Sequence, residues 1–235
     1  MMQKHIVSPS GLTIVVAMVC LFVATAAFSD QLRLLSPLGG NLTVPTVSLR
    51  EARFVSTMRQ QYDFSCGSAA VATLLTHHYG YAVTESKVFE VMFEHGDQAK
   101  IRREGFSMLD MKRYLDHLGF RTDGVEASLD QLVMASVPAI ALIQENGYAH
   151  FVVIKGLRYG KVLIGDPAMG TRAMERKAFE KIWINGILLV VRNKAGVARF
   201  NDVADWRVLP RAPIARGLEN NVADVQLLRR GAWDY

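Results

Sequence analysis

Hydrophobic and polar positions follow two different periods along the chain. Between about residues 65 and 135, apolar side chains recur every three or four positions, as they do on the buried face of an amphipathic helix. From residue 137 onward, short runs rich in valine and isoleucine alternate with turn residues. Helices that precede a sheet in this way predict an α+β fold.

The helical part of the pattern is punctuated by start and stop signals. Serine or threonine stands where each helix would begin, and glycine stands where three of them would end. The predicted helices run from Ser65 to Gly80, from Thr84 to Gly96 and from Ser107 to Gly119, and a short fourth helix starts at Ser128.

The strands are predicted from β-branched runs between turn dipeptides. These runs cover residues 137–144, 149–157 and 160–167, and one more strand is expected at 187–193. The first two turns contain Asn146-Gly147 and Tyr159-Gly160, which suit short connections. We therefore expect an antiparallel meander.

The N-terminus has a targeting pattern. Residues 12–28 are apolar, Lys4 precedes them, and small residues follow at Ala24, Ala26, Ala27 and Ser29. Residues 1–29 are thus a signal peptide or, if uncleaved, an anchor that associates with the inner membrane through residues 11–28. Both alternatives predict an exported, periplasmic protein. The rest divides into a linker at 30–47, a domain at 48–194 and a C-terminal tail at 195–235.

Composition excludes several function classes. The 235 residues carry a net charge of +5, without a Lys/Arg run that would indicate nucleic-acid binding. Phosphate-loop, dinucleotide and zinc-finger motifs are absent from the sequence, so no cofactor is expected. No metal site is expected either, since adjacent histidines such as His77-His78 rarely bind one ion and no HExxH occurs.

Cysteine usage singles out one residue. Of the two cysteines, Cys20 lies in the targeting segment, so cleavage leaves Cys66 without a disulfide partner. An odd cysteine in an exported protein is either a buried bystander or a reactive thiol. At the first turn of its predicted helix, Cys66 is expected to have a lowered pKa. Gly67 beside it would let a substrate backbone approach.

A reactive thiol needs a base, an orienting acid and oxyanion donors. His150 opens a predicted strand, whereas His77 and His78 lie at the end of the Cys66 helix, too far from the thiol. Asp166 follows the next strand and could accept a hydrogen bond from His150 Nδ1. Cys, His and Asp in this order are what a papain-type triad requires, and Gln60 or Gln61 could supply an oxyanion donor.

The motifs around these residues resemble a known family. The stretch QQYDFSCGSAAVATLLTHHYG, with GFSMLDM, VPAIA, HFVVI, DP and FxxIW after it, is similar to papain-like cysteine peptidases that remove double-glycine leaders from bacteriocin precursors. The resemblance implies a polypeptide substrate with small residues at the cut. It also implies Cys66 as nucleophile, His150 as base, Asp166 as orienting acid and Gln60, rather than Gln61, as oxyanion donor.

The chain also departs from that family. Ser65 replaces the usual aspartate before the cysteine, and the chain has no transporter or ATPase segment. As a standalone, exported member of such a family, this chain resembles the peptidases of functional-amyloid (Fap) secretion systems. The resemblance implies that it processes a protein needed to secrete amyloid or biofilm fibres. A non-catalytic peptide-binding accessory protein with the same cleft remains an alternative, as does an acyltransferase or amidase.

One further motif lies in the linker. Leu32, Leu35 and Leu38 precede Gly39-Gly40, a spacing that is similar to the leader motif cut by this family. The segment is either a self-processing site, a mimic that occupies the cleft, or a loop of the export linker.

Overall fold

The computed structural model describes residues 31–35, 41–45 and 48–208 of the chain. Two compact units divide at residue 47, and each is described by itself. The predicted signal peptide or anchor at residues 1–29 lies outside the described residues. No helix within the described part is long and apolar enough to cross a membrane.

The first unit contains a β-hairpin. Strand β1 (Gln31–Leu35) pairs antiparallel with β2 (Asn41–Pro45), and Gln31 stands opposite Pro45. This hairpin lies within the segment predicted as a linker at 30–47. Gly39-Gly40 falls in the connection between the strands, outside the described residues.

The second unit is built on a six-stranded antiparallel sheet with the order β3-β8-β4-β5-β6-β7. Strands β4 to β7 follow each other as a meander, and β8 returns between β3 and β4. The strands are β3 (Thr122–Glu126), β4 (Ala139–Glu145), β5 (Tyr148–Arg158), β6 (Lys161–Asp166), β7 (Gly170–Glu175) and β8 (Trp183–Val191). The predicted meander is confirmed, and sequence reasoning missed β3 and β7.

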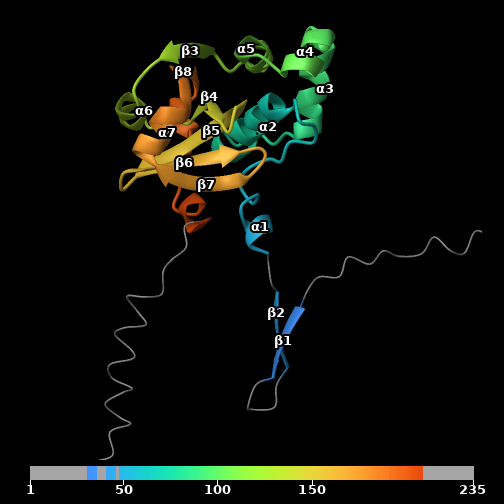
Figure 1. Cartoon of the computed structure of the whole chain (residues 1–235), viewed down its shortest axis with the longest axis vertical. Helices are drawn as coiled ribbons and strands as arrows, with labels where there is room; N and C mark the ends of the chain where they lie inside the picture. Colours follow the sequence, from blue (N-terminus) through green and yellow to red (C-terminus); the bar gives the residue numbers. More distant parts are fainter. Residues whose placement is uncertain (1–30, 36–40, 46–47, 209–235) are drawn as a thin grey trace, which may run out of the picture. The chain divides into compact units, whose positions relative to one another are not determined.

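Helices cover both faces of this sheet, as Figure 1 shows. One apolar core joins the sheet to α2 (Cys66–Thr73), α3 (Glu85–His95), α4 (Gln98–Glu104) and α5 (Met108–His117). A second core lies beneath α6 (Leu129–Ala135) and α7 (Arg176–Ile182). A short helix α1 (Leu49–Ala52) precedes them. The predicted α+β class is confirmed, while α4 and α7 were not predicted.

Helix α2 is the central helix of the unit. All eight of its residues are buried. Its side chains are small, so α2 can pack closely on β5. The helix continues as a π-helical turn, η1 (Leu74–His78), in place of the regular helix predicted to Gly80. Its N-terminus places Cys66 beside the start of β5.

The segment after β8 belongs to the domain. It forms the short 3₁₀ helices η2 (Ala195–Val197) and η3 (Asp205–Val208). Between them, the Arg199 amide donates to His78 O at 2.8 Å and the Asn201 amide donates to Lys155 O at 2.9 Å. The boundary at residue 194 stays a prediction, and these contacts show that residues 199 and 201 lie against η1 and β5.

Candidate active site

The loop before α2 determines where the thiol lies. Ser65 occupies the N-cap position, but its side chain does not cap the helix. Its Oγ instead accepts from the Tyr62 amide and donates to Tyr62 O, both at 3.1 Å. This closes the loop from Gln60 to Ser65 into a tight turn, and Cys66 follows it with 6% of its surface exposed.

Burial dominates the ionisation of the thiol. It raises the pKa of Cys66, although the backbone N–H groups of Phe151, Gly67 and Cys66 itself favour the thiolate and oppose this effect. The prediction of a lowered pKa was therefore wrong for the free enzyme, since the helix N-terminus does not outweigh desolvation. A thiolate at neutral pH requires proton transfer to a neighbouring base.

His150 is the candidate base. It immediately precedes Phe151, whose amide favours the Cys66 thiolate. Its Nε2 lies 3.1 Å from Asp166 Oδ2, and its Nδ1 is buried without a hydrogen-bond partner among the described residues. The prediction that Nδ1 binds Asp166 was wrong, because Nε2 makes this bond. Nδ1 is the ring nitrogen that remains able to accept a proton.

Asp166 ends β6 and is completely buried. Burial raises its pKa, but the His150 bond and charge, the Ala168 amide and the Arg172 charge together outweigh burial, so the pKa of Asp166 lies below its ordinary value. Its Oδ1 accepts from the Ala168 amide at 2.9 Å and from the Met169 amide at 3.1 Å. The carboxylate therefore stays ionised at neutral pH and orients the His150 ring.

The two candidate glutamines have different surroundings. The Gln60 amide donates to Pro167 O at 3.1 Å, which ties Gln60 to the segment just after Asp166. Its side-chain Nε2 donates to Tyr62 O at 3.1 Å, within the loop that leads to Cys66. Gln61 is exposed, and its Nε2 donates to Ser86 Oγ of α3 at 2.6 Å. The backbone thus keeps Gln60 next to the triad and directs the Gln61 side chain towards α3.

Gly67 has a packing role. A Cβ atom at this position would lie 2.9 Å from Phe106 Cβ, closer than side chains tolerate. Gly67 therefore lets α2 pack against the connection between α4 and α5. The predicted contact between Gly67 and a substrate backbone stays a prediction.

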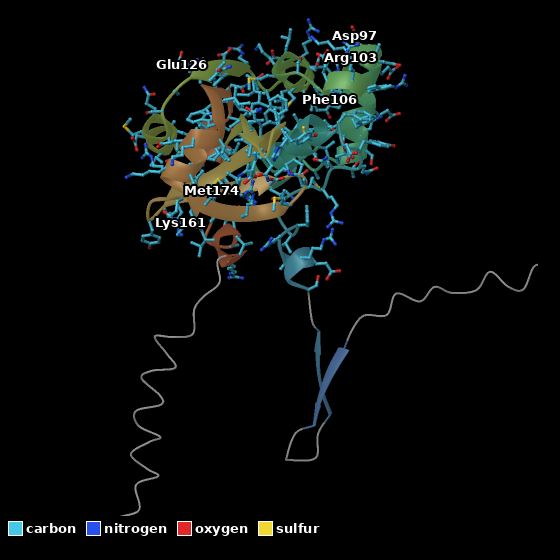
Figure 2. The ribbon with its side chains drawn as sticks, viewed as in Figure 1. Asp97, Arg103, Phe106, Glu126, Lys161 and Met174 are labelled. Atoms are coloured by element: carbon cyan, nitrogen blue, oxygen red, sulfur yellow. The ribbon has the colours of Figure 1, made fainter. Side chains whose placement is uncertain are left out.

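A groove of about 630 Å³ runs up to Cys66. Its lining comes from α4, the connection between α4 and α5, and strands β4, β5 and β8, and it includes the Arg103 and Phe106 labelled in Figure 2. The apolar lining includes Phe64, Phe106, Met108, Leu142, Ile184 and Ile187. The charged lining residues are Asp63, Arg102, Arg103 and Glu104. Such a groove can hold an extended or helical peptide with apolar side chains.

Sequence reasoning missed three residues around the triad. Tyr148 lines the groove, stacks on the His150 ring at 5.7 Å between centroids, and donates from its hydroxyl to Asp63 O at 2.6 Å. Arg172 binds Asp166, and Glu145 binds Arg172. Only Tyr148 had a sequence signal, because it stands two positions before His150 in the same strand.

The other histidines lie apart from this site. His78 is 1% exposed, and its Nδ1 lies 2.6 Å from Arg199 O. Burial first, then the charge of Lys155, lowers the pKa of His78 to about 4. It therefore stays neutral at the end of η1. The residues that the structure describes contain no His/Cys/Asp/Glu cluster able to bind a metal.

Comparison with known proteins now adds to this geometry. Residues 55–195 match the family described as Peptidase C39 family. The chain belongs to this family. It is a cysteine-type peptidase with a papain-like α+β fold, as its sequence motifs predicted.

Two relatives extend the match. The protein named "Probable functional amyloid protease FapD" in Pseudomonas fluorescens is 36% identical over 216 residues, which cover 90% of this chain and 93% of that protein. Its namesake in Pseudomonas aeruginosa is 43% identical over 154 residues, 65% of this chain and 68% of the relative. The peptidase domain of Streptococcus ComA, at 21% identity and a TM-score of 0.49, aligns with 58% of this chain and 97% of that domain.

Proposed function

We propose that this C39 peptidase is an exported endopeptidase that processes a protein needed for the secretion of functional amyloid fibres. Two relatives named as functional amyloid proteases support this proposal, and one of them aligns with 90% of the chain. The apolar N-terminal segment supports export to the periplasm, with or without an inner-membrane anchor. The substrate is a polypeptide segment with small residues at the cut.

The contact that carries the catalytic assignment is the bond between His150 Nε2 and Asp166. It leaves the buried Nδ1 unpartnered beside the amide that faces Cys66. His150 Nδ1 takes the thiol proton, and the Cys66 thiolate attacks the peptide carbonyl. The Cys66 amide and Gln60 Nε2 then hold the oxyanion. To do so, Gln60 Nε2 gives up its hydrogen bond to Tyr62 O. The imidazolium protonates the leaving amine and later activates water for hydrolysis of the thioester.

The proposal is tested by comparing the proteins secreted by cells that express the wild-type or the Cys66→Ala chain. N-terminal sequencing by mass spectrometry should find one exported fibre component or secretion partner with a new N-terminus only in the wild-type strain. Fibre export should fall in the variant strain. Cell fractionation of both strains checks whether the chain is exported.

The control distinguishes cleavage from binding. A Cys66→Ser chain that restores full fibre export without any new N-terminus would replace the proposal by a peptide-binding accessory role. Identical secretomes in all strains would overturn the link to amyloid secretion and leave the peptidase assignment in place. A further test needs no substrate. Iodoacetamide should alkylate Cys66 selectively near neutral pH, and this reaction should be lost in His150→Ala if Cys66 and His150 form a catalytic dyad.

A further inference from the structure

The Asp166 carboxylate has no acceptor position to spare. Its Oδ2 accepts from His150 Nε2 at 3.1 Å and from Arg172 Nη2 at 3.0 Å, and two backbone amides occupy Oδ1. A carboxylate bound by four donors cannot rotate without breaking a charge-assisted hydrogen bond. Arg172 therefore competes with His150 for one oxygen atom while it helps to hold that atom in place.

The strand register explains how Arg172 reaches the triad. Gly170 of β7 pairs with Asp166 of β6, and Arg172 stands two positions further along β7. Residues in such a diagonal relation lie on the same face of a sheet, within reach of a long side chain. Arg172 is thus delivered by the edge strand that follows the Asp166 turn.

Glu145 binds the other side of the same guanidinium. Arg172 Nη2 lies 2.6 Å from Glu145 Oε2, at the end of β4, and the Arg172 side chain is only 17% exposed. Its Nε is buried without a partner among the described residues, which is costly for a cation. An arginine buried at this cost between two carboxylates points to a role beyond stability.

We propose that Arg172 and Glu145 are positioning residues that hold Asp166 against His150 and set how tightly the His150 ring retains its proton. The inference rests on the catalytic roles proposed above. The positive charge of Arg172 disfavours the imidazolium, and the negative charge of Glu145 compensates for part of this effect. The other groups near this chain of charges are Cys66 of α2 and Tyr148 of β5.

The test is an NMR titration of the histidine rings in the full chain that carries Cys66→Ala, in which no thiol titrates with His150. The His150 signal is assigned by its loss in His150→Asn. In this background, Arg172→Met should raise the titration midpoint of His150 by about 0.5–1 pH unit. Glu145→Gln should lower it by a smaller amount, and the double variant should return towards the parent.

Two matched variants complete the test. Arg172→Lys keeps the charge and should keep the midpoint near that of the parent. Arg176→Met removes an arginine that binds Asp130 and Glu180 at the surface and should leave the midpoint unchanged. A merely structural role would move the midpoint in the same direction for Arg172→Met and Glu145→Gln, or would not move it, and either result overturns the inference.

The failure of this inference is distinguishable from the failure of the proposed function. Alkylation of Cys66 by iodoacetamide in the wild-type chain reports whether His150 activates the thiol, and it does not involve variants at Arg172. Rapid alkylation combined with unmoved midpoints rejects the role of Arg172 alone. Slow alkylation combined with opposite midpoint shifts rejects the catalytic dyad and keeps the electrostatic role.

Discussion

The same strands carry two buried ionic clusters that differ in how completely they are hydrogen-bonded. The first, the catalytic cluster, contains His150 of β5, Asp166 of β6 and Arg172 of β7. The second, the Lys155 cluster, joins Lys155 of β5 to Thr171 of β7, to Asp205 of η3 and to Ser56. Both clusters include residues of β5 and β7, and the Lys155 cluster also draws on Ser56 and on Asp205 of η3.

In the Lys155 cluster every charged donor has an acceptor. Lys155 is fully buried, and its Nζ lies 2.6 Å from Ser56 O, 2.6 Å from Ser56 Oγ and 3.1 Å from Asp205 Oδ2. The catalytic cluster instead leaves His150 Nδ1 and Arg172 Nε without partners in the described part of the chain. A fully hydrogen-bonded cluster stabilises a structure, whereas a buried polar atom without a partner costs stability.

The largest expected effect comes from removing the nucleophile. Cys66→Ala should lower peptidase activity at least about 10⁴-fold, because no other group in the site can form the thioester. The free energy of unfolding should change by less than about 1 kcal/mol, since the deleted atom is small. Cleavage of the substrate and a urea titration measure the two quantities. A large loss of stability would show that the catalytic cluster also holds the fold.

The Lys155 cluster should respond in the opposite way. Asp205→Ala leaves Lys155 buried without its counter-ion and should lower the free energy of unfolding by about 3 kcal/mol or more. Burial already lowers the pKa of Lys155, and Asp205 opposes this effect. The double variant Lys155→Met/Asp205→Ala should recover part of the loss. If the activity of the folded fraction fell as well, the two clusters would not be independent.

The two glutamines in the loop before α2 provide the next test. Gln60→Ala should reduce kcat about 10²–10³-fold, because it removes one oxyanion donor. This loss should be at least as large as that of Asp166→Asn, and Gln61→Ala should be nearly silent because its side chain binds Ser86. Single-turnover cleavage by the three variants measures the order. A severe Gln61→Ala with a silent Gln60→Ala would reverse the assignment of the two glutamines.

The smallest effect concerns pH and His78, which packs near the Lys155 cluster. Its folded-state pKa of about 4 lies below the ordinary 6.5, so between these values only the unfolded chain gains the proton. Stability should therefore fall by up to about 3 kcal/mol as the pH drops from 6.5 to 4. His78→Asn should flatten this slope in urea titrations, and exposed His117→Asn should not. Equal slopes in all three proteins would contradict the assignment.

Much of the fold was predictable because its helices and inner strands bury regular apolar patterns. The elements that were missed bury too few apolar side chains to show a regular pattern. Helix α4 buries only Ile101, α7 buries only Phe179, and β3 is a polar edge strand. The docking of the segment after β8 depends on buried polar contacts at Lys155 and His78, which leave no periodic signal.

The candidate site was predictable to the level of residue types. Motif order predicted Cys66, His150 and Asp166 as the triad, and the structure brings His150 and Asp166 into contact. Which ring nitrogen makes this contact depends on how β5 and β6 align, which spacing does not encode. The direction predicted for the pKa shift of Cys66 was wrong because the burial of α2 depends on tertiary packing. Arg172 was missed because its strand carries little hydrophobic pattern.

The Lys155 cluster has a consequence for how this domain can be joined to other chains. Ser56 lies where the polypeptide enters the domain and Asp205 lies where it leaves, and both bind the same ammonium group. Entry and exit are therefore neighbours. A domain with adjoining ends can be inserted into a host protein, or circularly permuted through a short linker, without pulling its sheet apart. Lys155 therefore ties both ends of the domain to the same strand of its sheet.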